Sequence, residues 1–118
     1  MVNAFIFHGS NGNPEKHWYP WLKNKLKENN HNVFIPQFPI EDNQKLENWF
    51  NTIDPLKKYL ENSILIGHSL GVPFILNLLN KFDYKIKSSF LVSGFVGHLE
   101  VEDEPNIGDF SEREFEWE

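Results

Sequence analysis

The segment Gly67-His68-Ser69-Leu70-Gly71 limits the possible fold more than any other feature of this chain. It fits the pattern G-x-S-x-G and lies between an apolar run, residues 63–67, and a long apolar segment, residues 70–82. Glycines on both sides of a serine are typical of a sharp strand-to-helix turn, because the backbone is strained there and the helix packs close to the strand. We therefore predict a nucleophile elbow that holds the Ser69 hydroxyl at the edge of a sheet.

Short apolar runs and segments with helical spacing alternate along the rest of the chain. The strand-like runs occupy residues 3–8, 33–36, 63–67 and 88–95, and the helical spacing occupies residues 18–26, 46–60 and 70–82. Such alternation favours right-handed βαβ crossovers and a parallel sheet covered on both faces. We expect one α/β domain over residues 1–118 with about four parallel strands. The large aromatic residues of the helical segments are expected to face its core: Trp18, Trp21, Trp49 and Phe50.

The composition is that of a globular domain with few options for bound groups. Hydrophobic residues make up 40% of the 118 residues and aromatic residues 15%. The absence of cysteine excludes disulfides and thiolate metal sites, and it fits a cytoplasmic protein. The apolar run at residues 1–7 is too short for a signal peptide or a membrane span. We expect no cofactor, no bound metal and no membrane partner.

The net charge of −6 is unevenly distributed. Residues 1–99 hold ten lysines against eight acidic residues, whereas residues 100–118 hold nine acidic residues and one arginine. The body of the protein is therefore nearly neutral, and no basic patch indicates a nucleic-acid partner. The acidic tail is typical of a solvated surface segment.

A serine nucleophile needs backbone donors for the oxyanion that forms when it attacks a carbonyl. The N–H of Leu70 follows the serine directly, and the loop at His8-Gly9-Ser10 offers a second donor, for which the Ser10 N–H is our candidate. Both segments follow strands, and open parallel sheets bind ligands at the carboxyl ends of their strands. The alternatives are an ordinary turn at the loop and an inert serine in a structural or phosphate-binding turn.

The sequence offers no well-placed base for Ser69. His8, His17 and His68 adjoin turns or a helix start, where packing or hydrogen bonding accounts for them better than proton transfer does. His98 follows the fourth strand-like run, so it is the histidine that could swing toward the serine. The identity of the base stays open at this point.

The last residues offer acidic side chains and an incomplete helix. Asp103 and Asp109 could lie near the cleft, but no spacing singles out either as the acid. Residues 110–115 hold a helix-start signal, in which Ser111 and Glu114 can form a capping box. The sequence stops at Glu118, about two turns after the cap at Ser111, and so short a helix is unstable without tertiary support. We expect the chain to end inside an element.

Five segments together resemble one family. In the order of the chain they are His8-Gly9, residues 17–22, residues 46–49, residues 67–71 and residues 91–95. The chain is similar over essentially its whole length to small α/β-hydrolases, the retinoblastoma-binding-protein-nine and YdeN-like serine hydrolases. The resemblance implies a partial α/β-hydrolase fold with the strand order second, first, third, fourth. It also implies hydrolysis of carboxylic esters or related small acyl compounds by Ser69.

Departures from the family pattern limit what the resemblance implies. Family members are longer: a later strand is followed by the catalytic aspartate, and a Gly-His pair near the C-terminus supplies the base. The resemblance therefore implies a C-terminally truncated domain that lacks later strands, the acid and the histidine, and that alone is inactive or very weak. The alternatives are an inactive half-domain acting as a binding module and an enzyme that uses His98. The open apolar edge at residues 88–95 predicts self-association or binding of a complementary C-terminal segment.

Overall fold

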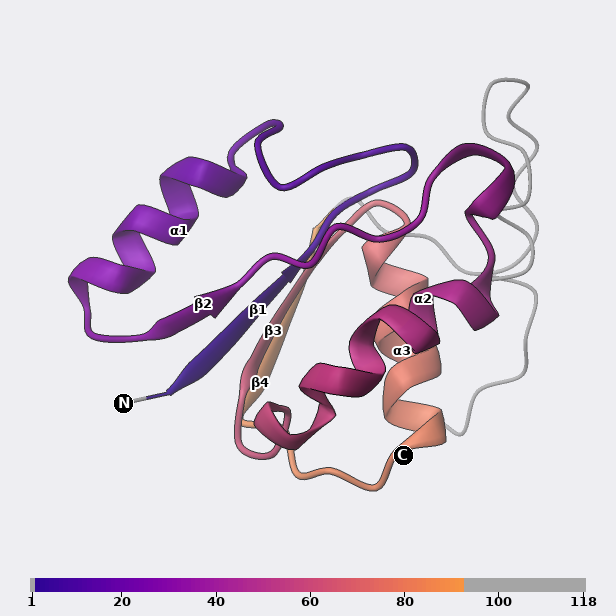
Figure 1. Cartoon of the computed structure of the whole chain (residues 1–118). Coiled ribbons are helices and arrows are strands. Elements are labelled where there is room, and N and C mark those ends of the chain that lie inside the picture. The colour runs from indigo at the N-terminus through magenta and orange to yellow at the C-terminus, as the bar shows by residue number, and fades with distance from the viewer. Residues whose placement is uncertain (1, 93–118) are drawn as a thin grey trace.

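The computed structural model describes residues 2–92, which form a twisted parallel sheet between helices (Figure 1). The strands are β1 (Asn3–Phe7), β2 (Asn32–Phe34), β3 (Ile64–His68) and β4 (Ser88–Val92). The helices are α1 (Tyr19–Glu28), α2 (Leu46–Ile53) and α3 (Gly71–Lys81), with the 3₁₀ turns η1 (Glu41–Asn43) and η2 (Asp54–Tyr59). The predicted alternation of strands and helices is confirmed.

The sheet has the order β2-β1-β3-β4, and all neighbouring strands are parallel. This is the order that the resemblance predicts. The chain passes from β1 to β2 on one side and then returns to the other side of β1 to form β3. The order of the strands therefore reverses between β1 and β3, and ligands of open α/β sheets bind at the carboxyl ends of the strands at such a point.

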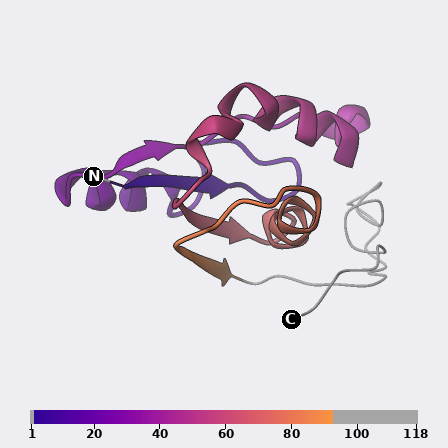
Figure 2. The same ribbon diagram turned by 90° about the horizontal axis from the view of Figure 1, so that it is seen from below.

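Helices cover both faces of the sheet, as Figure 2 shows. On one face, Phe5, Phe7 and Leu65 pack with residues of α2 and α3 in the main core. On the other face, Ile6 and Ile66 pack with Tyr19 of α1. Successive side chains of a strand point to opposite faces, so the continuous apolar runs of β1 and β3 supply both cores.

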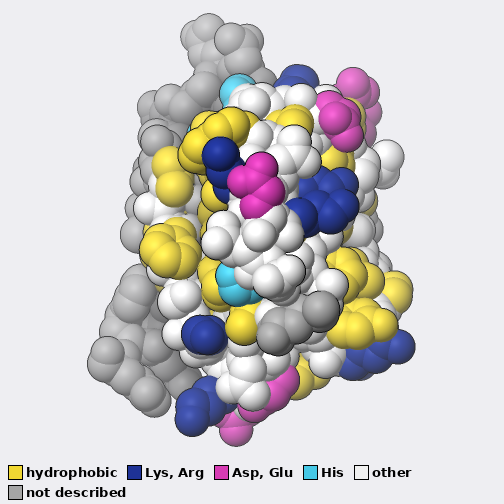
Figure 3. Space-filling model, turned by 90° about the vertical axis from the view of Figure 1, so that its left-hand side faces the viewer, with side chains coloured by type: hydrophobic (Ala, Val, Ile, Leu, Met, Phe, Trp, Pro, Cys, Tyr) yellow, Lys and Arg dark blue, Asp and Glu magenta, His cyan; other side chains and the backbone are white. Residues whose placement is uncertain are grey.

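The expectation that Trp21 faces the core is wrong. Its side chain is 63% exposed, whereas Trp49 is fully buried and Trp18 and Phe50 are partly buried. The buried residue of α1 is Tyr19. Two residues advance a helix by about 200°, so Trp21 lies on the side opposite Tyr19. The surface on the α1 side, seen in Figure 3, has lysine side chains at several separate places among hydrophobic ones.

Helix α1 ends in a Schellman motif, which turns the chain into β2. The N–H of His31 donates to the carbonyl of Leu26, and the N–H of Asn30 donates to the carbonyl of Lys27. Asn30 has φ 65°, a left-handed conformation that asparagine tolerates better than most residues. The asparagine-rich segment at residues 29–32 therefore ends the helix.

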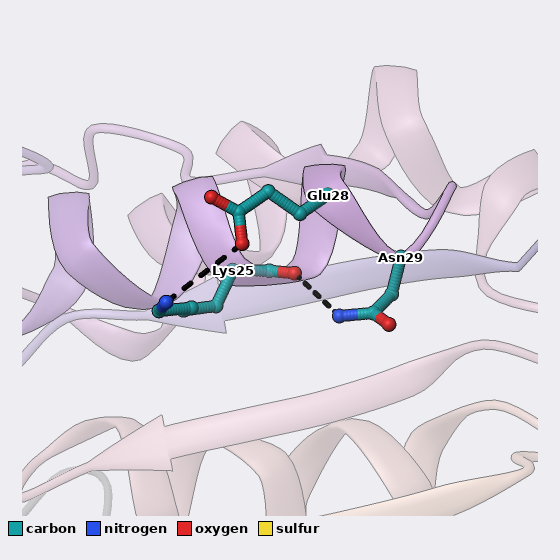
Figure 4. Close-up of polar contacts among 3 residues, drawn as sticks. All are labelled: Lys25, Glu28 and Asn29. Atoms are coloured by element: carbon teal, nitrogen blue, oxygen red, sulfur yellow. Dashed lines mark hydrogen bonds and ion pairs between the residues drawn. The ribbon is translucent and has the colours of Figure 1, made fainter.

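Polar side chains support the last turn of α1 (Figure 4). The Asn29 side-chain amide donates to the carbonyl oxygen of Lys25 at 2.8 Å. The Lys25 ammonium lies 3.8 Å from the Glu28 carboxylate, with both side chains more than half exposed. An exposed ion pair of this kind contributes little to the free energy of unfolding. The hydrogen bond from Asn29 gives one of the last carbonyl groups of the helix a donor.

Strand β4 covers the first part of the predicted strand at residues 88–95, and residues 93–95 lie outside the described part. Phe90 and Leu91 of β4 are about half exposed and Val92 is 38% exposed. Pairing of this strand with another segment or another copy stays a prediction. His98, Asp103, Asp109 and residues 110–115 also lie outside the described residues. Within residues 2–92, no helix has the length and apolar character needed to cross a membrane.

Candidate active site

Ser69 occupies a strained turn between β3 and α3. Its φ is 55°, a left-handed conformation that costs energy in a residue other than glycine. The Ser69 N–H donates to the carbonyl of Val92, and its carbonyl accepts from the N–H of Val72. The side chain is partly exposed. The turn thus holds a hydroxyl at the carboxyl edge of the sheet, as the G-x-S-x-G pattern predicts.

The two glycines of the motif allow close packing of α3 on the sheet. A Cβ added to Gly71 would overlap the carbonyl oxygen of Phe7 in β1. A Cβ added to Gly67 would lie 2.9 Å from the carbonyl oxygen of Gly71 and 2.7 Å from Cδ1 of Ile75. Real Cβ atoms do not approach backbone so closely. Both positions therefore require glycine to keep the turn in place.

The loop after β1 lies directly against Ser69. A Cβ added to Gly9 would be 3.1 Å from Cβ of Ser69 and 3.7 Å from its Oγ. Gly9 is buried, and its carbonyl accepts from the N–H of Gly12, which closes the loop into a turn. The structure therefore brings together the two segments that the sequence singled out, residues 8–10 and residues 67–71.

The backbone donors in this region differ in whether they have partners. The N–H groups of Gly9, Asn11 and Gly12 donate to the Tyr19 hydroxyl, the Gln44 side-chain oxygen and the Gly9 carbonyl. For the N–H groups of Ser10 and Leu70, residues 2–92 supply no acceptor. Leu70 is fully buried, and a buried N–H without a partner is rare. Within residues 2–92, both candidate donors therefore differ from their neighbours in having no acceptor.

His8 is a buried structural ring. Its Nε2 accepts the N–H of Phe38 at 2.9 Å, so Nδ1 carries the proton and donates to the Gly9 carbonyl at 2.7 Å. Burial lowers the pKa of His8, which favours this neutral form. The expectation of a packed, hydrogen-bonded ring is confirmed, and both ring nitrogens are occupied.

His68 and His17 form a cluster with Tyr19 beside the serine turn. His68 Nδ1 lies 2.7 Å from the Tyr19 hydroxyl, and the ring of the exposed His17 contacts the His68 ring edge-to-face at 5.2 Å. Burial lowers the pKa of His68, and the neighbouring His17 lowers it further. His68 is hydrogen-bonded to Tyr19, as expected of a structural histidine.

No described side chain is placed to act as the base. Within residues 2–92, no side chain forms a hydrogen bond to the Ser69 hydroxyl. The same part of the chain contains no group of three or more metal-binding side chains. Tyr19 and Gln44 are the polar residues of this region that sequence reasoning missed. Both are buried, and both contact the loop after β1.

Acidification should destabilise the fold through His8. Because the folded-state pKa lies below the ordinary value of 6.5, the unfolded chain binds the proton more readily. The free energy of unfolding should be highest above that value and decrease as pH falls through it toward the folded pKa. Thermal melts at about pH 7.5 and about pH 5.5 measure the effect, and we expect the lower Tm at the acidic pH. In the uncharged variant His8→Gln, Tm should decrease less between the two pH values than it does in the wild type. An equal decrease would contradict the contribution of His8 to acid destabilisation.

The parallel sheet and the strained serine turn at its carboxyl edge define an α/β-hydrolase architecture. The chain belongs to the serine hydrolase family, whose sequence model matches residues 4–116. It is 34% identical over 99 residues to YdeN of Bacillus subtilis (strain 168), which is named as a hydrolase; the match covers 81% of this chain and 52% of YdeN. The family and the fold predicted from the sequence are confirmed.

Solved structures show the same fold. The crystal structure of the B. subtilis ydeN gene product matches with a TM-score of 0.82 at 28% identity, covering 98% of this chain and 62% of that one. An extracellular α/β-hydrolase from a Paenibacillus species matches with a TM-score of 0.68 at 21% identity, and the match covers 83% of this chain and 43% of that one. A pyrethroid hydrolase from Sphingobium faniae JZ-2 matches with a TM-score of 0.64 at 20% identity, and the match covers 91% of this chain and 48% of that one. The last two show the fold alone, and the chain spans about half the length of its curated relative.

Proposed function

We propose that this protein hydrolyses carboxylic esters or related small acyl compounds, with Ser69 as the nucleophile in a nucleophile elbow. One observation carries the proposal: a strained, partly exposed serine lies beside a loop and a helix start whose N–H groups, at Ser10 and Leu70, have no acceptor among residues 2–92. A fold alone supports many functions. A serine next to backbone donors that have no acceptor within the described residues supports acyl transfer.

The proposed reaction proceeds through an acyl-enzyme. A base takes the Ser69 proton while Oγ attacks the acyl carbon, and the carbonyl oxygen becomes an oxyanion that accepts hydrogen bonds from the Ser10 and Leu70 N–H groups. Collapse of the tetrahedral intermediate breaks the bond to the leaving alcohol, which takes the proton from the base. Water, deprotonated by the same base, then releases the acid and regenerates Ser69.

We place the base and its orienting acid outside residues 2–92. His8 has both ring nitrogens in hydrogen bonds, and His68 Nδ1 is engaged by Tyr19. A site with the oxyanion donors and binding alone retains roughly 10³-fold catalysis over water, far below a complete triad. The variant His98→Ala tests whether that histidine serves as the base. Loss of activity would assign it, and full activity would place the base elsewhere.

Turnover of chromogenic esters tests the proposed function. The native protein is assayed with p-nitrophenyl esters of increasing acyl length, and a fluorophosphonate is then added. We expect saturable hydrolysis that the fluorophosphonate abolishes, because it would react with the activated serine. The acyl length with the highest kcat/KM would define the substrate class. Absence of both turnover and fluorophosphonate reaction would contradict the proposal. It would favour the alternative that the protein is a non-catalytic binding module.

A further inference from the structure

Two buried polar side chains fasten the loop that carries the Ser10 N–H, and the proposed chemistry does not use either directly. Tyr19 begins α1 and Gln44 follows η1, so they approach the loop from different elements. Tyr19 is fully buried and Gln44 is 1% exposed. Burying a hydroxyl or an amide is costly unless it is hydrogen-bonded, so their partners show what they hold in place.

The Tyr19 hydroxyl joins the loop to the serine turn. It accepts the N–H of Gly9 at 3.1 Å and lies 2.7 Å from Nδ1 of His68. If the hydroxyl donates its proton to Nδ1, the Tyr19 oxygen both accepts and donates a hydrogen bond, and His68 is the neutral Nε2–H tautomer. One oxygen atom thus connects the residue before Ser10 with the residue before Ser69.

The Gln44 side chain holds the other side of the loop. Its Oε1 accepts the N–H of Asn11 at 2.7 Å, and its Nε2 donates to the Ser10 hydroxyl at 2.9 Å. The Asn11 side-chain oxygen in turn accepts the N–H of Glu41 at 2.8 Å. Asn11 has φ 51° and Glu41 has φ 56°, so this cross-tie joins two residues in the left-handed region, which asparagine tolerates and which is unfavourable for glutamate.

These contacts use the backbone N–H groups on both sides of Ser10 and leave the Ser10 N–H itself without an acceptor within residues 2–92. An oxyanion donor must lie within a few tenths of an ångström of its ideal position to stabilise the transition state. We propose that Tyr19 and Gln44 are positioning residues that hold the Ser10 N–H beside Ser69, an inference that rests on the proposed function. They act through the loop and do not touch the substrate.

The variants Tyr19→Phe and Gln44→Met remove each tie while keeping similar volume. Their matched control is Tyr59→Phe, because Tyr59 is partly buried and stacks on Phe34 away from the loop. Active sites are counted by fluorophosphonate titration, and kcat per active site and KM are measured with the best ester. We expect kcat per active site to fall about 10- to 100-fold in each variant, with KM changed less than about threefold, since complete loss of one donor costs about 10²–10³ in kcat. Tyr59→Phe should keep its kcat.

A reduced number of active sites with unchanged kcat per site would overturn the inference, because it would show a purely structural role. Hydrogen exchange provides a readout that does not need activity. The Gly9 amide should exchange at least about tenfold faster in Tyr19→Phe, and the Asn11 amide in Gln44→Met, because each amide loses its acceptor. Unchanged exchange would also overturn it. If Ser69→Ala leaves ester turnover intact, the proposed function fails, while the exchange measurement still decides whether these side chains tie the loop.

Discussion

In the native protein with its base and acid in place, replacement of Ser69 by alanine should lower kcat for ester hydrolysis by roughly 10⁴- to 10⁶-fold, because it removes the atom that attacks the acyl carbon. KM for the residual reaction should change little, since the side chain that is removed is not expected to dominate substrate binding. The fold should stay intact, because the backbone hydrogen bonds of Ser69 to Val92 and Val72 do not involve its side chain. Initial rates with the best p-nitrophenyl ester measure the effect.

Ser63→Ala is the matched control for that substitution. Ser63 precedes β3, is fully buried, and its hydroxyl has no hydrogen-bond partner among residues 2–92. We expect this variant to keep its activity and its stability within about 0.5 kcal/mol, because no hydrogen bond is lost. If Ser69→Ala keeps more than a tenth of the activity, or if Ser63→Ala loses as much, Ser69 is not the nucleophile.

Replacement of Gly71 by alanine should strongly destabilise the fold. The new methyl group would overlap the Phe7 carbonyl oxygen, so α3 or β1 would have to move. Overpacking of this kind typically costs about 1–3 kcal/mol, and a rigid backbone carbonyl that cannot rotate away favours the upper end. A domain of this size loses about 4–8 °C in Tm for each kcal/mol. The shift of α3 should also displace the Leu70 N–H and lower kcat in the molecules that stay folded.

Chemical denaturation compares Gly71→Ala with Asn80→Ala, which changes an exposed position near the end of the same helix. Alanine favours a helix and the site is exposed, so Asn80→Ala should alter the free energy of unfolding by less than about 0.5 kcal/mol. Wild-type stability in Gly71→Ala would contradict the close packing of α3 against β1 that we describe.

The main helices could be predicted from the sequence because local patterns encode them, whereas the order of the strands was implied by the family resemblance. The spacing of Leu46, Trp49 and Ile53 places one side of α2 in the core, and these residues are buried as that spacing predicts. The glycines around Ser69 likewise marked a sharp turn, and the observed φ of Ser69 agrees with it. Ser10 was singled out because the loop after a first parallel strand meets the serine turn at one sheet edge.

The supports of the site could not be predicted because they depend on contacts between distant residues. Tyr19 lies between two tryptophans, and the periodic apolar pattern gave those tryptophans the core positions although Tyr19 takes the buried one. Gln44 lies in an irregular segment where no period exists, and its partners Ser10 and Asn11 are more than thirty residues away in the chain. Hydrogen-bonding capacity alone does not show which polar residue will be buried.

Mass spectrometry of the fluorophosphonate-treated native protein tests the central claim most directly. Trypsin cleaves after Lys58 and Lys81, so one peptide, residues 59–81, carries the turn, and its only serines are Ser63 and Ser69. We expect one phosphonyl group on this peptide, with fragment ions that place it on Ser69. An unmodified peptide, or a label on Ser63, would show that no activated serine nucleophile exists at this turn.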